Sequence, residues 1–409
     1  MMRRRRCACV LALLASARGY VTSAPRRAPA RRLVTASAAV DPTSFEGRLE
    51  SALRRSFPDG AADRAIACVL HNARGETLES VVPASAGDDG GDDAADFLVQ
   101  RAHTFVDGLS VTCFHDAQAH AWVRELEANW RVVADELSRE LARAGGGEGG
   151  EGEGGGEPLF LGARDAGAGE AYGAGWKTLG LYDRENWDAA NAARFPRTCA
   201  LLRASRAPVV EAFFAKMPAG ATIKPHTDEC NFVLTCHVGV AVPPGGACTL
   251  RVGDATRAWA DGEALLFDTS VVHAAQNRAT ADRSARVPPR RARGRRGRNA
   301  EAHLLPRRYV LMLRVWHPEL TPAERDALQF VFDAIDEPDL VSGDGADDAR
   351  LAVLRGYRAR AADALFGAGG SAVPGGAPRV AAAHAKAKAA DGGKAKRRKK
   401  GKKAKGFGG

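Results

Sequence analysis

The chain has 409 residues, 45% of them hydrophobic and 26% charged, which is the composition of a globular protein rather than a fibrous or disordered one. Its longest apolar stretch, residues 7–17, has 11 residues and is too short to span a bilayer, so we do not expect an integral membrane protein. The net charge of +10 is concentrated in residues 1–40, 284–306 and 375–409, which carry +9, +6 and +11. The rest therefore sums to −16, which argues against a nucleic-acid-binding surface along the whole chain.

Residues 1–40 have the pattern of a targeting segment. Four arginines, Arg3–Arg6, precede the apolar run, and a stretch rich in Arg, Ala and Ser without acidic residues follows it. A signal sequence followed by a transit-like segment is typical of proteins that enter a plastid by the secretory route. We therefore predict a plastid location. An ER or secretory signal and a mitochondrial presequence are the alternatives.

Residues 41–112 predict a small α/β lead-in, in which we find no residues that suggest chemistry. Apolar side chains four residues apart predict a helix over residues 44–57, and residues 65–70 are predicted to form a strand. Residues 113–142 predict one amphipathic helix that packs on the domain after it. Its apolar side chains recur at spacings of three and four: Trp122, Leu126, Trp130, Val133 and Leu137.

A Gly/Glu-rich linker, residues 143–158, leads into a strand-rich region over residues 159–340. Short apolar runs separated by Gly and Pro turns predict a sandwich or barrel, and residues 322–335 predict a helix. The runs are residues 222–223, 231–242, 248–252, 263–267 and 309–316.

The C-terminal part predicts a helix within residues 341–370 and a disordered basic tail over residues 371–409 that could contact acidic partners. The eight cysteines form no CxxC pair and are expected to be reduced thiols. Two of them, Cys230 and Cys236, lie near the candidate metal ligands in sequence.

Three residues could form a metal site. His226 and Asp228 are two positions apart, so on an extended strand their side chains would lie on the same face, and His273 follows later in the chain. Two histidines and one carboxylate are the ligand set of non-haem Fe(II) oxygenases, in which three positions remain open for cosubstrate and O2. The spacing alone is weak, because a histidine is often only a hydrogen-bonding group, and Asp228 could instead cap a turn.

Residues 175–335 resemble the aspartyl/asparaginyl β-hydroxylase family of Fe(II)/2-oxoglutarate-dependent oxygenases, and residues 120–137 resemble the segment that leads into that domain. The matching stretches are WKTLGLYD (176–183), FPRTCALL (195–202), PAGATIKPHTD (218–228), NFVLTCHVGVAVP (231–243), RVGD (251–254), RAWADGEALLFDTSVVHAAQN (257–277) and RYVLMLRVWHPELTPAER (308–325). The resemblance implies a mainly β double-stranded β-helix (jelly roll) with flanking helices and with the iron inside. It also implies that His226 and His273 are the iron-binding histidines. The animal enzymes have a glycine at the position of Asp228.

The resemblance further implies an arginine that binds 2-oxoglutarate. Counting back eight residues from Trp316 gives Arg308, which we favour, whereas counting forward from His273 gives Arg283. The two counts disagree because an Arg-rich insertion, residues 284–307, interrupts the family pattern. It could be a loop that binds an acidic partner, but we hypothesise that it is untranslated sequence, a hypothesis that tryptic peptides from residues 299–307 would defeat.

His237 matches a family histidine near the cosubstrate, with an internal structural role as an equal alternative. Ala215 and Thr235 stand where the animal enzymes have a Ser and an Arg, so details of the cosubstrate contacts are expected to differ. Asp268 is predicted to be a turn residue rather than a ligand, and His317 to be structural.

The function that the resemblance implies is hydroxylation of an unactivated C–H bond with Fe(II), 2-oxoglutarate and O2. The β-carbon of Asp or Asn in a protein or peptide is the default substrate. A small-molecule or acyl substrate is one alternative, and a non-catalytic cupin-like binding module is another. A third, a nucleic-acid-associated protein acting through the basic tail and the insertion, fits the acidic remainder of the chain poorly.

Overall fold

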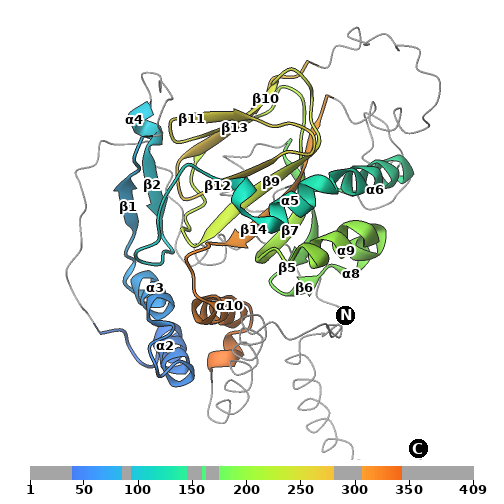
Figure 1. The fold of residues 1–409 in the computed structure, drawn as a ribbon. Coiled ribbons are helices and arrows are strands. Elements are labelled where there is room, and N and C mark those ends of the chain that lie inside the picture. Colours follow the sequence, from blue (N-terminus) through green and yellow to red (C-terminus); the bar gives the residue numbers. More distant parts are fainter. Residues whose placement is uncertain (1–38, 85–93, 145–158, 163–174, 281–305, 343–409) are drawn as a thin grey trace, which may run out of the picture. The chain divides into compact units, whose positions relative to one another are not determined.

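Two antiparallel sheets face each other and form the body of the molecule (Figure 1). The computed structural model describes residues 39–84, 94–144, 159–162, 175–280 and 306–342. The larger sheet has the order β3 (Phe114–His115), β12 (Ala264–Asp268), β9 (Val233–Ala241), β14 (Arg308–Trp316), β7 (Val209–Met217), β5 (Lys177–Asp183) and β4 (Leu161–Gly162), with β6 (Asn186–Trp187) paired to β5. The smaller sheet has the order β11 (Ala255–Ala258), β10 (Cys248–Val252), β13 (His273–Asn277) and β8 (Thr222–His226).

The central strands β9 and β14 are buried along their whole length, so both of their faces are covered. Side chains alternate between the faces of a strand. On β14, Val310 and Met312 join the core between the two sheets, whereas Leu311 and Leu313 join a second core under helices. The predicted mainly β jelly roll with flanking helices is therefore confirmed. By the same alternation, four polar residues of β9 and β14 point into the space between the sheets: Thr235, His237, Arg308 and Arg314.

The second core lies between the larger sheet and the helices α5 (Ala121–Ala128), α6 (Trp130–Arg143) and α9 (Pro196–Ser205), which follows the short α8 (Ala189–Arg194). The prediction of one continuous helix over residues 113–142 was wrong in detail. A 3-10 turn, η1 (Ala117–Ala119), precedes α5, and α5 and α6 are separated at Asn129. The Asn129 side chain donates to the carbonyl oxygen of Glu125 at 2.9 Å and so competes with the helical backbone bonds.

A third core joins the lead-in to the end of the domain, where α2 (Phe45–Ser56) and α3 (Asp63–Arg74) pack with α10 (Pro322–Asp336) and the 3-10 turn η2 (Pro338–Val341). The helix predicted from residue 44 is confirmed, with Ser44 as its N-cap. The strand predicted over residues 65–70 was wrong, because these residues belong to α3. A short apolar run does not distinguish the two structures, and here Gly75, with φ of 66°, ends a helix.

The lead-in continues as a hairpin of β1 (Leu78–Val81) and β2 (Val99–Ala102), with α4 (Ala94–Phe97) before its second strand. Each of the five apolar runs predicted in the strand-rich region coincides with a strand or part of one. The helix predicted there coincides with α10. Four segments lie outside the described residues: residues 1–38 of the targeting segment, residues 145–158 of the Gly/Glu-rich linker, the insertion up to residue 305, and the chain beyond residue 342.

Two further expectations, on the cysteines and on membrane-spanning helices, concern the described part of the chain. Its six cysteines are all buried and free. Cys236 faces the helices in the second core, away from the space between the sheets. Among the described helices, none combines the length and the apolar composition that crossing a membrane requires.

Candidate metal centre

Two histidines face each other across neighbouring strands of the smaller sheet. His226 ends β8, His273 begins β13, and the two residues are directly paired in the register of these antiparallel strands. Directly paired residues point to the same side of a sheet. The ring centroids are accordingly 4.2 Å apart, with an angle of 49° between the ring planes.

Backbone carbonyl groups fix the protonation pattern of both rings. The Nδ1 atom of His226 lies 2.8 Å from the carbonyl oxygen of Lys224, and that of His273 lies 2.9 Å from the carbonyl oxygen of Val271. Because a carbonyl oxygen only accepts, Nδ1 must carry the proton in each ring, which leaves the lone pair on Nε2. This second-sphere arrangement is typical of metal-binding histidines.

Asp228 completes a group of three. One donor atom from each of His226, Asp228 and His273 lies within 4.8 Å of the others, and the described residues contain no other such group of His, Cys, Asp or Glu. Asp228 Oδ1 is 3.8 Å from His226 Nε2. The Asp228 amide donates to the carbonyl oxygen of Thr269 at 2.7 Å, which ties the loop after β8 to the loop before His273.

The protonation states suit a divalent cation. Burial, followed by the charge of His226, lowers the pKa of His273 to about 4, so this imidazole is neutral near pH 7. Burial raises the pKa of Asp228, but the surrounding interactions, with the charge of Arg314 as the largest, outweigh burial and hold that pKa well below its usual range. Two imidazoles and one carboxylate are a donor set that fits Fe(II) and leaves open positions.

The buried guanidinium of Arg308 lies further along the inner face of the larger sheet. The Arg308 side chain is 1% exposed, and its Nε and Nη1 atoms have no hydrogen-bond partner among the described residues. Burial lowers the pKa of Arg308 to about 10. An unpaired buried guanidinium is costly, and a bidentate carboxylate is the partner that best satisfies it. The site therefore fits the distal carboxylate of 2-oxoglutarate. The alternative, Arg283, lies outside the described residues.

The aromatic ring of Trp259 supports this guanidinium, with its centroid 4.2 Å from Arg308 Cζ. The ring also lies 5.8 Å from that of His237, at an interplanar angle of 23°. Gly239 allows the turn that carries Trp259 to approach β9, since a Cβ atom at Gly239 would lie 1.9 Å from the carbonyl oxygen of Ala260. Trp259 was not among the residues singled out from the sequence.

His237 lies beside Trp259 on the inner side of β9. Neither of its ring nitrogens has a hydrogen-bond partner among the described residues. Burial, followed by the charge of Arg308, lowers the pKa of His237 well below its ordinary value, so the ring is neutral. It is available to hydrogen-bond a bound carboxylate, and its role near the cosubstrate stays a prediction.

The sequence reasoning missed Arg314, which is buried on β14 and donates from Nη1 to Asp228 Oδ2 at 2.7 Å. Arg314 is directly paired with Thr235 of β9, the position at which an arginine was expected from the resemblance. Period-two counting along β14 from Arg308 reaches Arg314 on the same face, and this signal would have found it. Ala215, the other departure, is buried on β7 in the core between the sheets.

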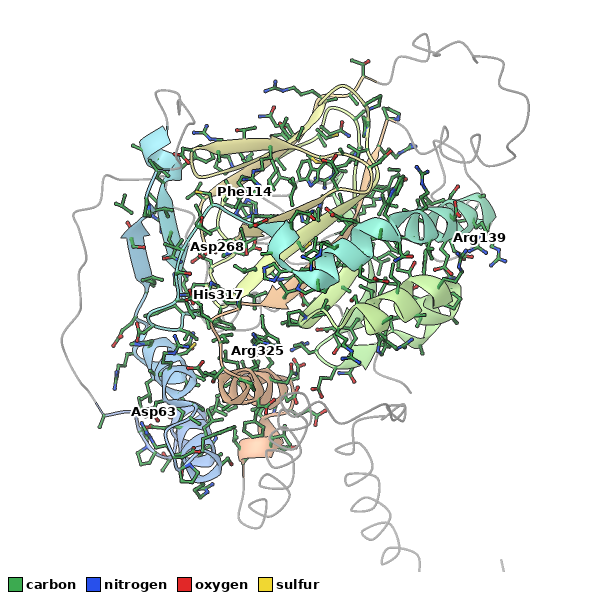
Figure 2. All side chains as sticks on the ribbon, in the orientation of Figure 1. Asp63, Phe114, Arg139, Asp268, His317 and Arg325 are labelled. Carbon is green, nitrogen blue, oxygen red and sulfur yellow. The ribbon has the colours of Figure 1, made fainter. Side chains whose placement is uncertain are left out.

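The two residues that were predicted not to bind metal have other roles. Asp268 Oδ1 accepts from the Ser270 amide at 2.8 Å and from its hydroxyl at 2.5 Å, as expected of a turn residue, and burial raises the pKa of Asp268 to about 7. Asp268 is labelled at the end of β12 in Figure 2, where the loop toward His273 begins. His317 accepts from the Glu319 amide at 3.2 Å and lies edge-on to His115.

The lead-in, for which no chemistry was expected, contacts both ligand-bearing loops. Beside the loop before His273, the Arg101 amide donates to the Ser270 carbonyl oxygen at 2.8 Å. Beside the loop after Asp228, the Asn231 side chain accepts from the Val106 amide at 2.9 Å and donates to the Val106 carbonyl oxygen at 3.0 Å. These loops are therefore held from outside by residues 99–106.

Comparison with known proteins gives consistent matches over this part of the chain. The sequence model of the family described as aspartyl/asparaginyl beta-hydroxylase matches residues 127–285, which include all three candidate ligands. The chain is 31% identical over 162 residues to the aspartate beta-hydroxylase domain-containing protein 2 of Homo sapiens, covering 38% of this chain and 37% of that protein. It is 29% identical over 212 residues to the aspartyl/asparaginyl beta-hydroxylase of Mus musculus, covering 50% of this chain and 23% of that protein. The matched region thus spans well under half the length of these relatives.

Proposed function

We propose that this chain is an Fe(II)/2-oxoglutarate-dependent dioxygenase, because residues 127–285 match the sequence model of the aspartyl/asparaginyl β-hydroxylase family. The observation that carries the proposal is the convergence of His226, Asp228 and His273, with donor atoms within 4.8 Å of one another. The buried Arg308 favours an enzyme over a cupin-like module without catalysis, because its Nε and Nη1 lack a partner among the described residues and a carboxylate cosubstrate would supply one.

The roles of the residues follow from their surroundings. His226 and His273 would bind the ion through Nε2, and Asp228 would add a carboxylate oxygen. Arg308 would hold the distal carboxylate of 2-oxoglutarate with two parallel hydrogen bonds, while Trp259 keeps the guanidinium in place. His237, which is neutral and whose ring nitrogens have no partner among the described residues, would donate a further hydrogen bond to the same cosubstrate.

When bound, iron and cosubstrate would supply the oxidation: O2 and 2-oxoglutarate would yield succinate and CO2, and one oxygen atom would enter a C–H bond of the substrate. Burial of Asp228, His237, His273 and Arg308 would exclude bulk water and strengthen the electrostatic interactions that orient the cosubstrate. The chain itself therefore contributes binding, orientation and a protected site.

For the substrate, we propose the β-carbon of an Asp or Asn residue in a protein or peptide. The names of the two relatives support this class. A small-molecule or acyl substrate is the competing outcome. Incubating a peptide library rich in Asp and Asn with the enzyme and searching by mass spectrometry for the gain of one oxygen atom distinguishes them, since a small-molecule hydroxylase leaves every peptide unchanged.

The activity is tested without knowledge of the substrate. The protein is loaded anaerobically with Fe(II) and 2-oxoglutarate, O2 is added, and succinate is measured. We expect slow succinate release that depends on the metal and is lost in His226→Ala. Folded protein that binds neither Fe(II) nor 2-oxoglutarate would overturn the proposal.

We also propose that residues 1–40 direct the protein to a plastid through the secretory route, on the basis of their arginines and apolar run. A fluorescent protein fused after residue 40 would report the destination. Accumulation in the ER or in mitochondria would favour one of the two alternatives.

A further inference from the structure

Arg314 and Asp228 form a buried ion pair beside the two histidines. The Arg314 side chain is 1% exposed, and its Nη1 donates to Asp228 Oδ2 at 2.7 Å. Its Nε lies 3.7 Å from Oε2 of Glu211 on β7. Arg314 is also directly paired in register with Glu211, so β7 supports the guanidinium on one side and Asp228 engages it on the other.

The two oxygen atoms of Asp228 have different environments. Oδ2 accepts the hydrogen bond from Arg314, whereas Oδ1 faces the histidines, 3.8 Å from His226 Nε2. A carboxylate with one oxygen engaged in a short charge-assisted hydrogen bond keeps a fixed orientation. Only Oδ1 is then directed at the position between the two imidazoles.

We propose that Arg314 is a positioning residue of the metal centre, which restricts Asp228 to binding the ion through a single oxygen. This inference rests on the proposed function and adds to it. On an octahedral ion, two imidazoles and one oxygen would occupy three of six positions and would leave three for cosubstrate and O2. A carboxylate that bound through both oxygens would leave only two, so the contact with Arg314 would preserve the third open position.

The test measures metal binding in the full chain, with Co(II) as a spectroscopic probe of coordination and Fe(II) as the proposed metal. Arg314→Gln removes the charge and keeps a side chain of similar shape. We expect its affinity for metal to fall about 10–100-fold, the usual range for loss of an outer-shell partner, and its Co(II) spectrum to shift toward higher coordination. Arg314→Lys keeps a cation that can donate the single hydrogen bond, and it is expected to retain most of the affinity and the wild-type spectrum.

A double-mutant cycle distinguishes an effect of Arg314 that acts through Asp228 from a general loss of structure around the metal site. If Arg314 acts through Asp228, Arg314→Gln has no further effect on metal affinity in a chain that already carries Asp228→Ala. An equal loss in both backgrounds, or a wild-type affinity and spectrum in Arg314→Gln, would overturn the inference. If Arg314→Gln does not fold, the Lys variant decides, because loss of metal binding in folded Arg314→Lys contradicts a role that needs only the charge and one donor.

The failure of this inference is distinguishable from the failure of the proposed function. A wild-type chain that binds no Fe(II) and releases no succinate defeats the proposed function. A wild-type chain that does both, with an Arg314→Gln variant that binds metal identically, defeats only the role of Arg314.

Discussion

The guanidinium of Arg308 lies over the indole ring of Trp259, with 4.2 Å between Cζ and the ring centroid. Both side chains are buried, and no hydrogen bond from Arg308 Nε or Nη1 reaches another described residue. The ring therefore stabilises the guanidinium on one side, while its donors remain available for an anion.

Replacing Trp259 should weaken cosubstrate binding without affecting the metal. A desolvated cation–π contact contributes about 2 kcal/mol, so we expect Trp259→Leu to raise the KM for 2-oxoglutarate by about 10-fold or more. Trp259→Phe keeps an aromatic face and should have a smaller effect. Steady-state succinate release at varied 2-oxoglutarate concentration measures both. A wild-type KM in Trp259→Leu would show that the ring does not position Arg308.

Arg308→Ala should have the largest effect on 2-oxoglutarate. Loss of hydrogen bonds to a charged group costs about 1.5–3 kcal/mol each, which corresponds to a loss of affinity of at least about 10-fold. Arg307→Ala, one residue before β14, is the matched control and should bind 2-oxoglutarate as wild type does. Calorimetric titration of 2-oxoglutarate into the Fe(II)-loaded protein measures the difference. If Arg283→Ala and not Arg308→Ala shows the loss, Arg283 is the anchor.

His115 should make the stability of the metal-free protein depend on pH. Burial, followed by the charges of His317 and His120, lowers the pKa of His115 from 6.5 to about 4. The unfolded chain therefore binds a proton at His115 that the folded chain does not, and stability falls as pH drops from 6.5 toward 4. The lost stability is about 3 kcal/mol, at about 1.4 kcal/mol per pKa unit. In His115→Phe this contribution disappears. Denaturation in chelator at several pH values compares the two slopes, and identical slopes would contradict the assignment.

We expect Asn231 to stabilise the packing of the lead-in against the loop that carries Asp228. Asn231→Ala leaves the buried amide and carbonyl groups of Val106 without their partner, at a cost of about 1–3 kcal/mol for each group. Asn129→Ala, whose side chain bonds only within its own helical turn, is the control, with an expected change below about 1 kcal/mol. Chemical denaturation measures both. An Asn231→Ala variant as stable as wild type would mean that the lead-in does not support this loop.

The apolar runs and turn residues were sufficient to predict the strands, whereas the jelly roll and the two iron-binding histidines were implied only by the resemblance to the hydroxylase family. The same-face argument for His226 and Asp228 was incomplete. β8 ends at His226, and Asp228 lies in a loop in which Glu229 has a φ of 59°. The lead-in contacts could not be predicted, because they are mostly backbone hydrogen bonds between segments far apart in the chain. Arg314 was overlooked since one arginine within an apolar run does not reveal its partner.

The central proposal is a ferrous ion bound by His226, Asp228 and His273, and anaerobic titration of 2-oxoglutarate tests it most directly. The titration is run on wild-type protein with and without Fe(II), and on His226→Ala with Fe(II). We expect tight binding only in wild-type protein with Fe(II), since the ion would provide one of the two anchors of the keto acid and Arg308 the other. Equal affinity with and without the metal, or an unchanged affinity in His226→Ala, would contradict this proposal.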